Sequence, residues 1–208
     1  MIDLNTLIIY STASLLLGLA PGPDNIFVLT QSVLYGRKAG FMVTLGLCTG
    51  LIVHTLVVTL GISAILQTSV IAFSILKYIG VIYLLYLSYK AFKSTGESIN
   101  NKKEPSLPSS HLYRRGIIMN VTNPKVSIFF MAFLPQFTNP VNGPIWLQLI
   151  LLGFIFMLST LLVFGTISQV SGTMGQYIFR SSRFNKILNR VAGTIFAALA
   201  LKLAFTER

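Results

Sequence analysis

Charged side chains are scarce in this sequence of 208 residues. They make up 10% of the chain, while hydrophobic residues make up 53%; a soluble domain is about 25% charged. So few charges cannot cover the surface of a water-soluble protein, which excludes an ordinary cytosolic domain. The high apolar content excludes a disordered chain. Cys48 is the only cysteine, so a disulfide scaffold is excluded as well.

Two long stretches carry no charged residue at all. They cover 38 positions, residues 39–76, and 54 positions, residues 126–179. An apolar run of about 18 residues already predicts a transmembrane helix. The longer stretch would measure about 80 Å as one helix, so it must fold back, and helix breakers in residues 135–144 mark the turn. We therefore predict an all-α membrane protein with six transmembrane helices, at residues 4–35, 40–63, 70–92, 114–137, 145–170 and 185–205.

The net charge of +11 is concentrated between the apolar runs. The connections after the first, third and fifth predicted helices hold most of the basic residues, and this bias places them in the cytoplasm and both termini outside. No basic stripe alternates with aromatics, so nucleic acid is not an expected partner. The basic residues in these connections are Arg37, Lys38, Lys90, Lys93, Lys102, Lys103, Arg114, Arg115, Arg180, Arg183, Lys186 and Arg190.

A polar segment divides the chain into two halves. Residues 94–112 are rich in Ser, Asn, Lys and Pro, which is typical of a flexible cytoplasmic linker between three-helix halves at 1–93 and 113–208. The pattern Lys-x-x-Gly-x-x-Tyr at 77–83 resembles Arg-x-x-Gly-x-x-Phe at 190–196. Because three is an odd number, two such repeats insert with opposite orientation. Inverted repeats with broken helices are typical of secondary transporters.

The first and fourth predicted helices are broken near their middles, and each break carries a charge. Asp24 and Lys125 are the only charged residues deep in the predicted spans. A charge there costs about 2.5–3.5 kcal/mol, so it indicates a partner or a function. We expect unwound backbone and a hinge at Gly18, Pro21, Gly22, Pro23 and Pro124.

The local chemistry of the breaks suits a ligand with two opposite charges. Pro23 fits the first position of a new half-helix, and Asp24 then lies in its first turn, where the helix dipole favours an anion. Asn123 is the expected N-cap of the second half-helix and Pro124 its first residue. Lys125 then needs an anionic partner, which is either Asp24 or the carboxylate of a ligand. The pair complements a zwitterion.

Other polar residues give weaker signals. His54 is a candidate proton relay, because histidine titrates near neutral pH, and Asn25 is expected to line the cavity. Gly46 and Gly50 favour close helix packing and permit a homodimer face. Two histidines and one cysteine placed far apart make no metal-ligand set, and no cofactor is expected.

Residues 18–25, Gly-Leu-Ala-Pro-Gly-Pro-Asp-Asn, and residues 36–41, Gly-Arg-Lys-Ala-Gly-Phe, resemble the signature of the LysE/RhtB family of amino-acid exporters. Residues 123–125, Asn-Pro-Lys, resemble its second motif. The resemblance implies efflux of amino acids such as homoserine, threonine, lysine or leucine through the bacterial inner membrane, driven by the proton gradient. The family's motif residues correspond here to Pro21, Gly22, Pro23, Asp24, Asn123, Pro124 and Lys125.

The leading hypothesis is therefore a proton-coupled amino-acid exporter that works by alternating access. Asp24 would bind the substrate ammonium or a proton in competition, and Lys125 would hold the substrate carboxylate. An exporter of small cations is the alternative, although Lys125 would repel the ion. An intramembrane enzyme lacks paired carboxylates, and a structural subunit would leave the two breaks unexplained.

Overall fold

Helices build this protein, as the apolar runs predict. The computed structural model describes residues 2–20, 22–62, 70–94, 107–171 and 182–205, and this part of the chain contains no strand. Four helices are long and apolar enough to cross a membrane, or six spans if each of two bent pairs counts as one. The α-helices are α1 (Leu4–Leu19), α2 (Pro23–Tyr35), α3 (Arg37–Val57), α5 (Val70–Lys93), α6 (Ser109–Val121), α7 (Pro124–Ile128), α8 (Ile145–Ser171) and α10 (Ser182–Ala204); π-helical segments are η1 (Val58–Ile62) and η2 (Phe129–Phe133), and 3-10 turns are η3 (Leu134–Phe137) and η4 (Pro140–Asn142).

The bent pairs are the two predicted broken helices. α1 and α2 meet at 59°, and α6 meets the helical run Pro124–Phe137 at 49°. α6 begins at Ser109, five residues before the expected start at 114, so the predicted linker is too long at this end. Arg114 and Arg115, which the sequence predicts in the connection, lie within α6, because this helix continues beyond the apolar run. The turn expected between the second and third spans, at 63–69, lies outside the described residues.

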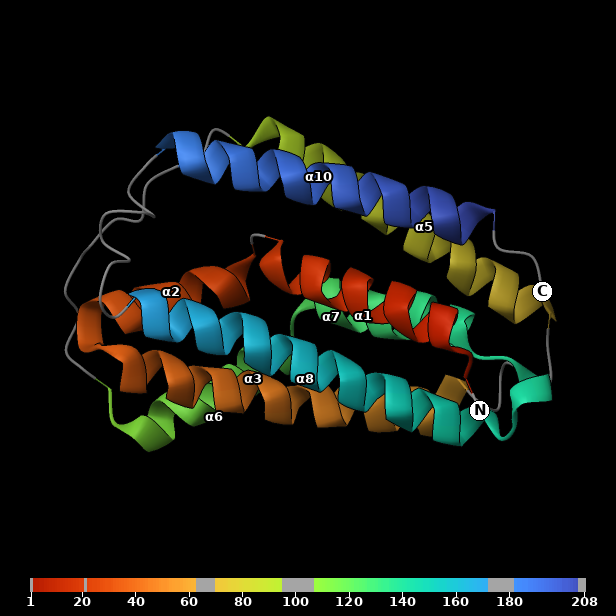
Figure 1. Cartoon of the computed structure of the whole chain (residues 1–208), viewed down its shortest axis with the longest axis horizontal. Helices are drawn as coiled ribbons and strands as arrows, with labels where there is room; N and C mark the ends of the chain where they lie inside the picture. Colours follow the sequence, from red (N-terminus) through yellow and green to blue (C-terminus); the bar gives the residue numbers. More distant parts are fainter. Residues whose placement is uncertain (1, 21, 63–69, 95–106, 172–181, 206–208) are drawn as a thin grey trace.

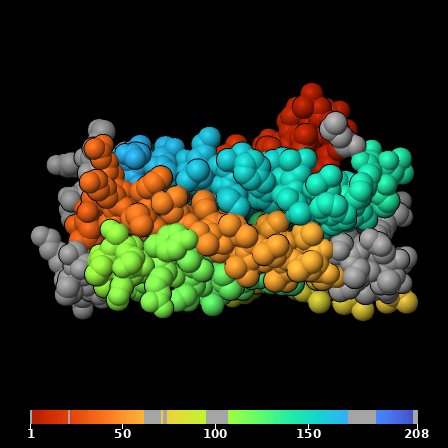
Figure 2. All heavy atoms as spheres, turned by 90° about the horizontal axis from the view of Figure 1, so that it is seen from below, coloured from red at the N-terminus to blue at the C-terminus, as the bar shows by residue number. Residues whose placement is uncertain are grey.

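The helices run roughly along one long axis (Figure 1). α5 and α10 lie side by side as a pair, and α3 packs between α6 and α8 (Figure 2). The start of α1 and the end of α10 lie at one end of the molecule. The α2–α3 junction, the end of α5 and the start of α6 lie at the other end, which therefore gathers most of the basic residues of the described segments.

Two apolar clusters form the core. One surrounds Tyr10 and Phe129 and includes parts of α1, η2, η3, α8 and α10. The other surrounds Val28 and Leu47 and includes parts of α2, α3, α6 and α8. The first cluster contains α1 up to Ala20, and the second begins on α2, so the first break lies between them. The two halves of this broken helix therefore pack mainly into different clusters.

Candidate functional site

The first break follows directly from its sequence. Pro23 has no backbone N–H with which to continue α1, so it begins α2 as that helix's first residue. Gly22 before it has extended backbone, with φ −167° and ψ 177°. Asp24 lies in the first turn of α2, where the dipole favours its carboxylate. Pro21, an expected hinge residue, lies outside the described residues.

Asn25 holds the two halves of this broken helix together. Its side-chain amide donates a hydrogen bond of 2.7 Å to the carbonyl of Gly18, seven residues earlier. Gly18 packs against α8, where a Cβ on the glycine would lie 3.4 Å from a methyl of Val163. Asn25 therefore braces the break through this bond.

The second break has the cap that the sequence predicts. The Asn123 side-chain oxygen accepts a hydrogen bond of 3.0 Å from the backbone N–H of Lys125, and Pro124 is the first residue of α7. The cap satisfies one of the backbone donors that a helix start leaves without a partner. Because the side-chain oxygen is held by the cap, the amide nitrogen of Asn123 points away from α7.

Asn123 also connects the two breaks. Its amide nitrogen donates a hydrogen bond of 2.8 Å to Oδ2 of Asp24, and both side chains are buried. The other carboxylate oxygen of Asp24, Oδ1, is buried without a hydrogen-bond partner among the described residues. Since a buried carboxylate oxygen without a partner is costly, Oδ1 is ready to accept a hydrogen bond from a donor.

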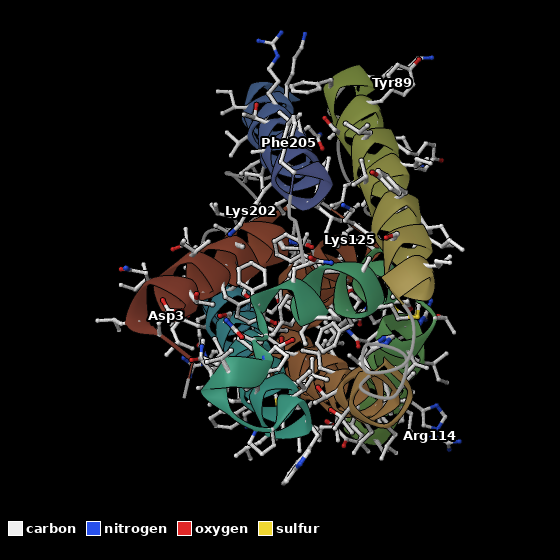
Figure 3. All side chains as sticks on the ribbon, turned by 90° about the vertical axis from the view of Figure 1, so that its right-hand side faces the viewer. Asp3, Tyr89, Arg114, Lys125, Lys202 and Phe205 are labelled. Carbon is white, nitrogen blue, oxygen red and sulfur yellow. The ribbon has the colours of Figure 1, made fainter. Side chains whose placement is uncertain are left out.

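Lys125 reaches across the interior to α1. Figure 3 shows it among the helices, whereas Arg114 lies at the periphery. Its ammonium donates to the carbonyls of Ala20, at 3.1 Å, and Leu17, at 3.5 Å. Among the residues that the structure describes, no salt bridge joins Lys125 to Asp24, so main-chain carbonyls hold the ammonium in place of that expected carboxylate. The two breaks are therefore cross-braced, each by a side chain from the other.

His54 of α3 lies against the last turn of α6 rather than in a hydrogen bond to Asp24. Its Nε2 is 3.1 Å from the carbonyl of Asn120, and its ring is 5.6 Å from the ring of Phe130. Because a carbonyl only accepts, Nε2 must carry the proton of this contact. The histidine thus joins the second break to α3.

The sequence reasoning missed two parts of the site. One is the Leu17 carbonyl and the identity of the cation: the break predicts that the Ala20 carbonyl can accept from a cation, but not that this cation is Lys125. The other is a group of buried aromatic rings, of which Phe129, Phe133 and Phe137 recur every four residues. That spacing was the available signal. The rings belong to Tyr10, Phe129, Phe130, Phe133, Phe137 and Phe156.

The change Asn123→Asp tests the cross-brace. Aspartate keeps an oxygen for the cap but loses the donor and places a second carboxylate beside Asp24, so we expect a melting temperature lower by about 4 °C or more, from roughly 1–3 kcal/mol of lost stability. Asn139 caps η4 with the same local contact, its oxygen accepting from Val141 at 3.0 Å, and it is exposed. Asn139→Asp is the matched control and should leave thermal stability unchanged. Equal effects of the two changes would contradict the cross-brace.

Comparison with known proteins identifies the family. A family model described as LysE type translocator matches residues 15–207, a range that contains both breaks. The chain belongs to this family. It is 30% identical over 208 residues to the uncharacterized membrane protein YrhP of Bacillus subtilis, with 96% of this chain and 98% of that protein covered. It is 27% identical over 202 residues to an uncharacterized membrane protein of Vibrio cholerae, with 97% and 98% covered. No solved structure matches the chain.

Membership of the LysE type translocator family makes this protein a membrane transporter rather than an enzyme. A translocator of this kind implies a small-molecule substrate and a lipid bilayer as its surroundings. The buried Asp24, Asn123 and Lys125 all lie in the matched range.

Proposed function

We propose that this LysE type translocator exports amino acids from the bacterial cytoplasm in exchange for protons. The observation that supports this best is the buried carboxylate of Asp24 at a helix break. Its Oδ1 has no hydrogen-bond partner among the described residues, and the buried ammonium of Lys125 binds a carbonyl of the same break. An amino acid carries an ammonium and a carboxylate, so it complements both groups.

The proposed site binds the substrate by exchanging partners. The substrate ammonium takes the free oxygen of Asp24, and its carboxylate draws the ammonium of Lys125 away from the carbonyls of Leu17 and Ala20. A proton and the substrate ammonium compete for the same carboxylate. One proton therefore enters for each substrate that leaves, which couples export to the proton gradient.

The two core clusters supply the gates for alternating access. Opening the cluster around Val28 would expose the break from one end of the molecule, and opening the cluster around Tyr10 would expose it from the other. Gly18, Gly22 and Pro124 form the hinge at the breaks. The inverted repeats, 1–93 and 113–208 joined by residues 94–112, would carry the two gates and exchange their conformations.

His54 is the proposed second coupling group, because it is buried and contacts the carbonyl of Asn120 close to the second break. The change His54→Gln keeps a donor for the Asn120 carbonyl but removes the titration. Export by this variant that no longer responds to the pH gradient would assign the coupling role to His54. An unchanged response would limit His54 to holding that carbonyl.

We place the protein in the inner membrane with the basic end of the bundle in the cytoplasm and both termini outside, from the positive-inside rule. The small residues of α3 are not available as the surface of a homodimer. Gly46 faces Tyr113 and Gly116, and Gly50 faces Asn120, so these glycines serve contacts within one chain.

Export of small cations is the alternative function. The position of Lys125 opposes it, because the ammonium occupies the carbonyls that would bind the ion. Purified protein in vesicles, given an imposed pH gradient and a mixture of amino acids, separates the two. We expect gradient-dependent movement of one or a few amino acids. Movement of Na⁺ or K⁺ with no amino acid would contradict the proposal.

A further inference from the structure

The ammonium of Lys125 lies at the C-terminal end of α1, where helices attract cations. α1 ends at Leu19, and the negative end of its dipole faces the break. Nζ donates hydrogen bonds to the carbonyls of Ala20, at 3.1 Å, and Leu17, at 3.5 Å. The ends of interrupted half-helices and their unwound carbonyls are where transporters coordinate cations such as Na⁺.

The sequence explains why these two carbonyls have no hydrogen-bond partner within a helix. The carbonyl of Leu17 would bond the N–H of residue 21 in an unbroken helix, but residue 21 is a proline and has no N–H. The carbonyl of Ala20 would bond the N–H of Asp24, which starts a new helix instead. Both oxygens are left for a donor from elsewhere in the molecule.

Space and charge at this point also suit a cation. Gly22 leaves room, since a Cβ on it would lie 3.1 Å from Nζ. Asp24 is buried two residues after Gly22 and forms no salt bridge with Lys125, and its Oδ1 has no hydrogen-bond partner among the described residues. Two carbonyls and a nearby carboxylate are oxygen ligands of the kind that hard cations prefer.

We infer that Lys125 is a tethered cation that fills a monovalent-cation site formed by the carbonyls of Leu17 and Ala20 in the field of Asp24. The protein therefore needs no alkali ion at its helix break, because it supplies the positive charge itself. Removing the ammonium while leaving its space open turns the position into a sodium site. The inference concerns the resting state and does not depend on which substrate the protein moves.

The test compares two variants, Lys125→Ala and Lys125→Met, with the wild type. Alanine removes the charge and leaves space for an ion; methionine removes the charge but fills most of the space of the lysine stem. Thermal unfolding of purified protein is followed in NaCl and in choline chloride at equal ionic strength. We expect sodium, at ten times its Kd, to raise the melting temperature of Lys125→Ala by about 3–6 °C. The wild type and Lys125→Met should show no difference between the salts.

A further variant tests the part played by the carboxylate. Asp24→Asn combined with Lys125→Ala removes both charges, and the sodium response should disappear with them. Recovery of folded Lys125→Ala only when membranes are extracted in sodium would support the inference more strongly. Three results would overturn it: loss of folded Lys125→Ala in both salts, no sodium shift in folded Lys125→Ala, or an equal shift in the wild type. Failure of amino-acid export in vesicles would leave all of these results unaffected.

Discussion

Asp24→Asn is expected to abolish proton-driven export while the protein still folds and inserts. The amide oxygen of the new side chain can accept the hydrogen bond from Asn123 in place of Oδ2, so the cross-brace between the breaks survives. What disappears is the negative charge that would bind an ammonium or a proton. A charge-assisted hydrogen bond contributes about 1.5–3 kcal/mol, or roughly tenfold to a hundredfold in affinity, and asparagine does not titrate at all.

The measurement is the rate at which amino acids cross the membrane of reconstituted vesicles, with and without a pH gradient. Asp3→Asn is the matched control, because Asp3 is the other described acid and is exposed. It caps α1 by accepting from the N–H of Thr6 at 2.9 Å, a role that asparagine fills equally well. The control should export at the wild-type rate. Gradient-driven export by Asp24→Asn at that same rate would remove Asp24 from the proposed mechanism.

Local sequence was sufficient to predict both helix breaks. Proline lacks the N–H that a helix interior needs, and Asn before Pro124 is a strong cap, so Pro23 and Pro124 begin helices where we expect them. These features depend on a few neighbouring residues and on covalent chemistry. The all-helical fold follows in the same way from apolar runs that water cannot solvate.

Contacts across the breaks could not be predicted in this way. Lys125 and Ala20 are 105 residues apart, and Asn123 and Asp24 are 99 apart. Which carbonyl or amide meets which charge depends on how α1, α7 and α8 pack, and similar apolar runs would fit several arrangements. The start of α6 at Ser109 was missed for another reason: a charged residue marks the membrane edge without ending a helix.

Gly46→Ala is expected to separate α3 from α6. A Cβ on Gly46 would run into the backbone carbonyl of Tyr113 and lie 3.0 Å from the Cα of Gly116. Backbone atoms cannot rotate away as a flexible side chain can, so the helices must move apart. Overpacking costs about 1–3 kcal/mol, and we expect a melting temperature lower by about 2–12 °C.

The matched control is Gly165→Ala in α8, where an added Cβ would meet nothing within 4 Å. Alanine there should be neutral or stabilise by up to about 1 kcal/mol, because it favours helix more than glycine does. Thermal unfolding in detergent measures both variants, and equal melting temperatures would show that α3 and α6 do not need this close approach. The same contact holds His54 beside the carbonyl of Asn120, three residues before the cap of the second break. Gly46→Ala should therefore reduce export even at temperatures where the variant is still folded.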